Sequence, residues 1–66
     1  MEDNNAIKLM KQMEQVFIAS CTETEKFVYN NNKSAATRLR KNMQVIKTLA
    51  QEVRKEVQAQ KNAVKV

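Results

Sequence analysis

Apolar residues in the second half of the chain recur at alternating steps of three and four positions. Such spacing places them on one side of an α-helix, in the heptad pattern by which helices pack against each other. The pattern predicts a helix over about residues 34–62. Its apolar seam consists of Ala36, Leu39, Met43, Ile46, Ala50, Val53 and Val57.

The first half of the chain carries a matching pattern, which predicts a helix over about residues 4–29. Ser20 and Thr24 fall where larger apolar side chains would pack better, so this seam is weaker in its middle. The seam consists of Ala6, Met10, Met13, Phe17, Ser20, Thr24 and Phe27.

An asparagine-rich segment separates the two predicted helices. The chain contains no Gly and no Pro, the two strongest helix breakers. The asparagines at 30–32 favour a turn over about residues 30–33, because Asn tolerates the left-handed backbone that ends a helix. Asn32 or Ser34 can cap the next helix. The sequence therefore predicts an all-α fold, an antiparallel and coiled-coil-like two-helix hairpin that forms a single domain over residues 1–66.

The chain has more apolar residues than one seam can hold, and a widened apolar face is typical of bundles with more than two helices. A chain of 66 residues buries only about 60% of the surface that its unfolded form exposes. Its single Cys excludes an intramolecular disulfide. We therefore expect a homo-oligomer, most simply a dimer that forms a four-helix bundle. The residues expected to hold the core and the oligomer are Met10, Met13, Phe17, Phe27, Ala36, Leu39, Met43, Ile46, Ala50, Val53 and Val57.

Charge is distributed unevenly between the two halves. Residues 1–30 carry three basic and five acidic side chains, whereas residues 31–66 carry nine basic and two acidic ones. A surplus of positive charge, as in residues 31–66, attracts polyanions. We therefore expect the second half to face a polyanion.

Five of these basic residues are each seven positions apart. They fall in one column beside the predicted seam, at heptad position e, with about 10.5 Å between neighbours along the helix. Such a ridge can contact several phosphates of a nucleic acid without reading any base. The alternative interpretation is that these charges keep the helix in solution and pair with acids on a neighbouring helix. The column is Lys33, Arg40, Lys47, Arg54 and Lys61.

The sequence offers little catalytic chemistry. It has no His, and without Gly no glycine-rich phosphate loop can form. Cys21 has no His to activate it and is interpreted as a buried or half-buried structural thiol. Glu52 and Glu56 are interpreted as surface-pairing residues rather than metal ligands. Tyr29 is expected to pack over the turn, and stacking on a base or sugar is the alternative. We expect no enzymatic activity, no metal, no cofactor and no small-molecule substrate.

The second half also resembles a known family. The segments that carry the likeness are Asn32-Lys33-Ser34-Ala35-Ala36-Thr37-Arg38-Leu39-Arg40-Lys41, then Ile46-Lys47, then Val53-Arg54-Lys55-Glu56. Over about residues 25–60 the chain resembles the linker-histone-like nucleoid proteins of chlamydiae and Bacteroidetes. The resemblance implies DNA binding and compaction. Together with Lys61 from the column, the candidate nucleic-acid-binding residues are Lys33, Arg38, Arg40, Lys41, Lys47, Arg54, Lys55 and Lys61.

The leading hypothesis is a sequence-tolerant, nucleoid-associated DNA-binding protein that contacts the phosphate backbone of double-stranded DNA. Paired RNA is left open as a partner, because the sequence does not separate the two. A structural or adaptor hairpin that mediates protein–protein assembly, within a larger particle, is the alternative. The polar, acidic N-terminus is unlike a signal peptide, no apolar run is long enough for a membrane span, and the lone Cys21 fits a reducing compartment, so we expect a cytoplasmic protein. As a DNA-binding protein, it would act on the nucleoid or be packaged with DNA in a virus particle.

Overall fold

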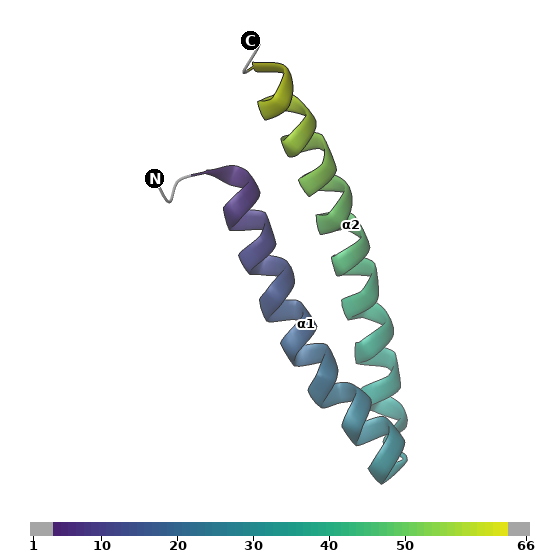
Figure 1. The fold of residues 1–66 in the computed structure, drawn as a ribbon. Helices are drawn as coiled ribbons and strands as arrows, with labels where there is room; N and C mark the ends of the chain where they lie inside the picture. Colours follow the sequence, from purple (N-terminus) through teal and green to yellow (C-terminus); the bar gives the residue numbers. More distant parts are fainter. Residues whose placement is uncertain (1–3, 64–66) are drawn as a thin grey trace.

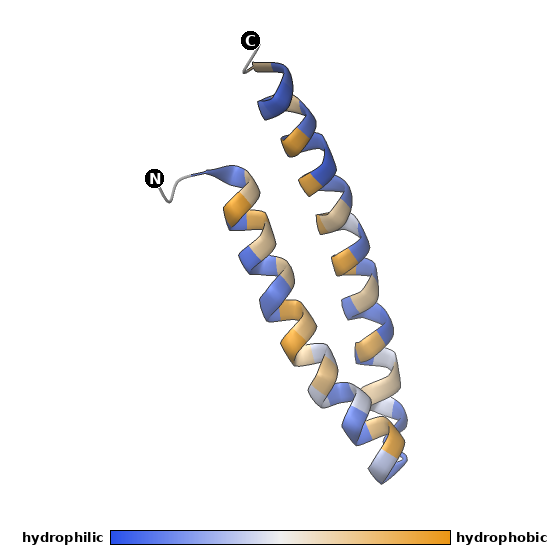
Figure 2. Ribbon diagram, viewed as in Figure 1, coloured by the Kyte–Doolittle hydropathy of each residue, from blue (hydrophilic) through white to orange (hydrophobic). Residues whose placement is uncertain are grey.

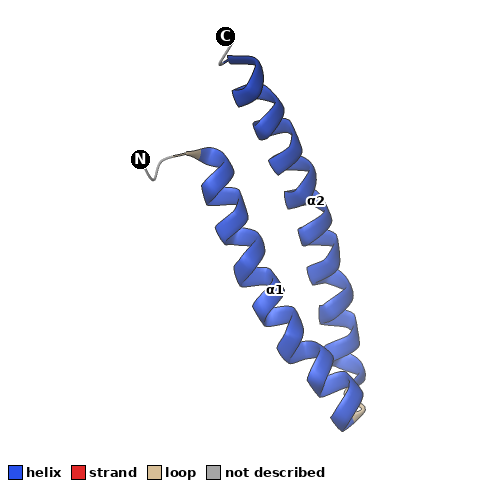
Figure 3. Cartoon of the chain, viewed as in Figure 1, coloured by secondary structure: helices blue, strands red, loops and turns tan. Residues whose placement is uncertain are grey.

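The structure is a computed structural model, and it describes residues 4–63. Two helices, α1 (Asn5–Asn30) and α2 (Lys33–Ala63), run antiparallel as a hairpin, with no strand among these residues (Figures 1 and 3). The molecule is a rod of 54 × 20 × 13 Å. The predicted all-α hairpin is thereby confirmed. Its assembly into a four-helix bundle stays a prediction.

The turn between the helices is built by two asparagines. Asn31 adopts the left-handed conformation, with φ 54° and ψ 39°, and the backbone N–H groups of Asn31 and Asn32 donate to the Lys26 carbonyl. This pattern closes the last turn of α1. The side chain of Asn32 then accepts from the Ala35 N–H at 3.1 Å and caps the start of α2. Consecutive asparagines thus end one helix and begin the next.

Asn4 performs two tasks at the free end of the hairpin. Its side-chain oxygen accepts from the backbone N–H groups of Ala6 at 2.8 Å and Ile7 at 3.3 Å, which caps α1. The amides of Asn4 and Gln60 also exchange two hydrogen bonds of 3.1 Å each. The cap of α1 therefore also joins the beginning of α1 to the end of α2.

The helices meet along one seam in which each residue is at least partly buried. Figure 2 shows hydrophobic positions on the side of α2 that faces α1 and hydrophilic positions along its outer side. Within the described residues, neither helix has a stretch long and apolar enough to cross a membrane. The seam consists of Ala6, Leu9, Met13, Val16, Ser20 and Glu23 from α1, and Ala35, Leu39, Asn42, Ile46, Leu49, Val53, Glu56 and Gln60 from α2.

This seam differs from the predicted one at every second position. In α2, Leu39, Ile46 and Val53 lie in it as expected, but they alternate with Ala35, Asn42, Leu49 and Glu56 instead of Ala36, Met43, Ala50 and Val57. In α1, Leu9, Val16 and Glu23 take the places of Met10, Phe17 and Thr24. The physical reason is that the column common to both seams, Leu39, Ile46 and Val53, is flanked on both sides by side chains that can pack against α1. The flanking residues are Asn42, Leu49 and Glu56 on one side and Met43, Ala50 and Val57 on the other.

On the more polar of these two sides, where the hairpin closes, several polar groups have partners. Arg38 forms an ion pair with Glu23 across the helices, the Gln60 and Asn4 amides bond across the free end, and within α2 the Gln60 side chain donates to a Glu56 carboxylate oxygen at 3.3 Å. Met10, Phe17, Phe27, Met43 and Val57 are consequently exposed, whereas Ala36 and Ala50 are half-buried. Their place in the core of an oligomer stays a prediction.

The core of the hairpin is thin. Among residues 4–63, Ala35 is the only apolar residue that is buried, and no large side chain is fully buried. Ser20 is buried as well; its hydroxyl donates to the Val16 carbonyl at 2.8 Å, and the Thr24 hydroxyl donates to the Ser20 carbonyl at the same distance. Because these hydroxyls are satisfied within their own helix, small polar residues are tolerated in the middle of α1.

Candidate nucleic-acid interface

The five-residue basic column forms a continuous ridge on α2. We call it the basic stripe; its residues are Lys33, Arg40, Lys47, Arg54 and Lys61, and all five are exposed. Because α2 is one uninterrupted helix over 31 residues, the side chains repeat every two turns, about 10.5 Å apart. A single rigid element therefore fixes the spacing of all five charges.

The stripe faces away from α1 rather than flanking the seam. The seam uses the column of Asn42 and Leu49 instead of that of Met43 and Ala50, so its centre lies about 50° further from the stripe than the sequence predicts. The stripe thus occupies heptad position b and not the expected position e. Charges at b point outward, where they cannot reach across to α1. This weakens the interpretation that the stripe serves to pair with acids on α1 of the same hairpin.

Arg38 behaves differently from the stripe. Its Nε lies 3.0 Å from Oε1 of Glu23, which is largely buried in the seam. Among residues 4–63, this is the only ion pair that the structure shows. Half of the Arg38 side chain remains exposed. Arg38 was predicted as a nucleic-acid contact, and its geometry gives it a structural task in joining α1 to α2 near the turn.

Two shallow polar depressions lie along the outer face of α2, and their linings are related by a shift of 14 residues. One is lined by Thr37, Arg40, Lys41 and Gln44, and the other by Gln51, Arg54, Lys55 and Gln58. The two Arg-Lys pairs are about 21 Å apart along the helix. Each pair of charges is therefore flanked by uncharged side chains that can donate hydrogen bonds to an anion.

The acids of α2 lie on a different side of the hairpin. Glu52 and Glu56 line a hollow together with Asn5, Lys8, Leu9 and Gln12 of α1. No acidic residue lines either of the two depressions on the outer face. The outer face of α2 therefore presents positive charge without a neighbouring carboxylate, which favours contact with a polyanion.

The structure places all eight predicted nucleic-acid residues on α2 and leaves each of them exposed. Sequence reasoning missed the uncharged members of the outer face, namely Thr37, Gln44, Gln51 and Gln58. A sequence repeat could have revealed them. Each of the pairs Arg40-Lys41 and Arg54-Lys55 has a polar residue three positions before it and a Gln three positions after it. Tyr29 was expected to pack over the turn and Cys21 to be buried or half-buried; both predictions were wrong, because both side chains are exposed.

Comparison with known families decides the affiliation. A family described as histone H1-like protein Hc1 matches residues 7–63, which takes in nearly all of α1 and the whole of α2. The chain belongs to this family. The Hc1 family comprises histone-like nucleoid proteins that package DNA, and it is not a family of enzymes. The resemblance read from the sequence is thereby confirmed. No curated protein and no solved structure shows significant similarity to the chain.

Proposed function

We propose that this Hc1-family chain binds double-stranded DNA without sequence preference, in the nucleoid, through the outer face of α2. The observation that carries the proposal is the basic stripe, five exposed charges in one column that points away from α1. Membership of a histone H1-like family supports DNA as the polyanion. Backbone contacts of this kind fix position on a duplex but carry no sequence information.

The spacing of the stripe suits a helix that lies along a phosphate backbone. Duplex DNA carries a charge per about 1.7 Å of its axis, counted over both strands, so several side chains spaced about 10.5 Å apart can each reach a phosphate with a flexible Lys or Arg. The Arg-Lys pairs supply two charges at each depression, and Gln44, Gln51 and Gln58 can add neutral donors. Contacts with three to five phosphates per chain follow from this arrangement.

The test is a titration of a duplex across a salt series, followed by fluorescence anisotropy. Contacts with three to five phosphates predict a slope of log affinity against log salt of roughly −3 to −4.5. Duplexes of different base composition should bind equally. A flat salt response would contradict the proposal, and tighter binding of paired RNA would replace DNA as the partner.

A matched pair of variants separates the stripe from net charge alone. The triple substitution Arg40→Gln, Lys47→Gln and Arg54→Gln removes three charges from α2, and it should reduce affinity roughly a hundredfold and the magnitude of the salt slope by about 2.7. The control is Lys8→Gln, Lys11→Gln and Lys26→Gln on α1, which removes the same charge and should change affinity less than about threefold. Equal losses in both variants would show that the stripe is not the contact surface.

A structural or adaptor function remains a second candidate, and the exposed apolar side of the hairpin favours it. Met10, Phe17 and Met43 are large apolar residues on one side of the rod that no part of the described chain covers. An adaptor would hold a protein partner through this side and would retain it at high salt. The salt series therefore distinguishes the two functions, since phosphate contacts are lost as salt rises.

A further inference from the structure

The side of α2 that faces away from α1 consists of three columns of side chains, each repeating every seven residues. The first is the basic stripe; we call the second the central column and the third the far column. Within residues 33–63 none of the three contains an acidic residue, and every member is exposed. This side is therefore positive along its whole length. The central column is Thr37, Gln44, Gln51 and Gln58, and the far column is Ser34, Lys41, Thr48, Lys55 and Asn62.

Positive charge on this side is doubled at two heights. The far column has one Lys beside Arg40 and another beside Arg54, so an Arg-Lys pair lies astride the central column at each height and lines one of the two depressions. The pairs are about 21 Å apart, and a single Lys of the stripe lies about 10.5 Å beyond each of them, at Lys33 and Lys61. The charged heights along the rod are therefore separated by about 10.5, 21 and 10.5 Å.

Duplex DNA presents its two phosphate backbones at unequal intervals along its axis. Each turn of about 34 Å contains a wide groove of about 12 Å and a narrow groove of about 6 Å, and the two backbones occupy the rest. A line along the surface, parallel to the axis, therefore crosses a backbone at intervals that alternate between roughly 20 Å and roughly 14 Å. The two Arg-Lys pairs fit the wide interval. Lys33 and Arg54, about 31.5 Å apart, are separated by nearly one turn and so meet the same strand.

We propose that α2 lies lengthwise on a B-form DNA duplex, parallel to the duplex axis, with its two Arg-Lys pairs on opposite strands across the wide groove. Each pair holds one backbone where that backbone passes under α2, with the Arg on one side of the central column and the Lys on the other. Lys33 and Lys61 reach the next crossings, because their long side chains cover the difference between about 10.5 Å and roughly 14 Å. Lys47 lies midway between the pairs and extends along the axis to reach either backbone. This placement rests on the proposed DNA binding and adds which strands are held.

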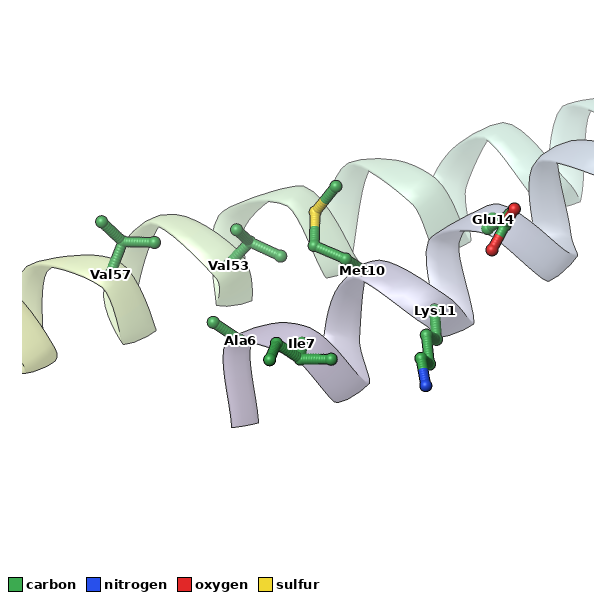
Figure 4. A pocket seen from close by; sticks show the side chains of 7 residues that line it. All are labelled: Ala6, Ile7, Met10, Lys11, Glu14, Val53 and Val57. Carbon is green, nitrogen blue, oxygen red and sulfur yellow. The ribbon is translucent and has the colours of Figure 1, made fainter. Parts of the chain in front are cut away.

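The placement leaves the contacts between the helices untouched. The apolar groove of about 610 Å³ between α1 and α2 opens on another side of the hairpin; in Figure 4, Val53 and Val57 of α2 face Ala6 and Met10 of α1 across it. None of the residues that line this groove belongs to the three outward columns. Substitutions in the far column therefore alter neither the seam nor the groove.

The first test moves one Lys along the far column without changing composition or net charge. Lys55→Thr with Thr48→Lys takes the second doubled charge away from Arg54 and puts it beside Lys47, over the wide groove. Lys55→Asn with Asn62→Lys is the matched control, because it puts the same charge beside Lys61, where a backbone crosses. The first variant should bind duplex DNA about fivefold more weakly than the wild type, and the control should stay within about 1.5-fold, because only the first loses a phosphate contact.

Fluorescence anisotropy on one duplex and on a single strand of the same length measures these affinities. A single strand offers no second backbone at a fixed distance, so the wild type and both variants should bind it equally. Far-UV circular dichroism checks that the helix content is unchanged. If the first variant binds the duplex as tightly as the wild type, or if both variants lose affinity equally, the placement is wrong.

The second test measures how much duplex one chain covers. The stripe spans about 42 Å, which corresponds to about 12 base pairs when α2 lies along the axis. On hairpin duplexes of increasing length, the salt slope for the first chain bound should therefore grow up to about 12 base pairs and then stay constant. A helix that crosses the duplex is only about 10–12 Å wide, so a slope already complete at about 6 base pairs would overturn the placement. A flat salt response at every length would instead remove the proposed function itself.

Discussion

Helices α1 and α2 contribute to the same seam and differ in the surfaces that face away from it. α1 exposes large apolar side chains on several sides, including Phe17, Ile18 and Val28, and its basic and acidic residues balance. α2 exposes fewer apolar residues and carries a fourfold excess of basic over acidic ones. The difference teaches that the two helices share one seam but present surfaces of different kinds outside it. α1 exposes mainly large apolar side chains, and α2 exposes mainly basic ones.

The largest expected effect comes from breaking the seam that the helices share. Val16→Asp in α1 or Ile46→Asp in α2 places a charge between the helices and should cost about 3 kcal/mol in free energy of unfolding. Ile18→Asp and Val45→Asp, on exposed positions, should cost less than about 0.5 kcal/mol. Urea unfolding followed by far-UV circular dichroism measures both. Equal costs at seam and exposed positions would contradict the observed register of the seam.

A smaller effect should follow from adding charge to one helix or the other. Gln44→Lys with Gln51→Lys extends the outer face of α2 beside the stripe and should raise DNA affinity about tenfold in low salt. Gln15→Lys with Thr22→Lys adds the same charge to exposed positions of α1 and should raise it less than about threefold. Anisotropy titrations of one duplex compare the two variants. A gain that is the same on both helices would mean that net charge alone governs binding.

The smallest expected effects concern the caps, which the two helices form in the same way. Asn4→Ala and Asn32→Ala each remove a side-chain oxygen that accepts from backbone N–H groups, and each should cost about 1 kcal/mol in free energy of unfolding. The loss at Asn32 should be the larger, because the Ala35 N–H belongs to a buried residue. Thermal unfolding of both variants gives the ranking. The reverse order would show that the Asn4–Gln60 pair holds the free end more strongly than the turn is held.

Much of this protein follows from local sequence. The three-and-four spacing of apolar residues and the absence of Gly and Pro determine two long helices, since both act within a few turns of the chain. Asn31 and Asn32 determine where the chain reverses. The seven-residue spacing of the basic stripe makes it a single ridge on any continuous helix, however that helix is packed.

Tertiary structure alone decided which side of each helix is covered. Leu39, Ile46 and Val53 have usable neighbours on both sides, and the apolar pattern favours Met43 and Val57 over Asn42 and Glu56. The helices pack on the polar side, where the Glu23–Arg38 ion pair and the Asn4–Gln60 hydrogen bonds form only once both helices are in place. Helical periodicity cannot register a contact between residues that are distant in sequence. Packing on the polar side turned the basic stripe away from α1 and left Met10, Phe17 and Met43 exposed.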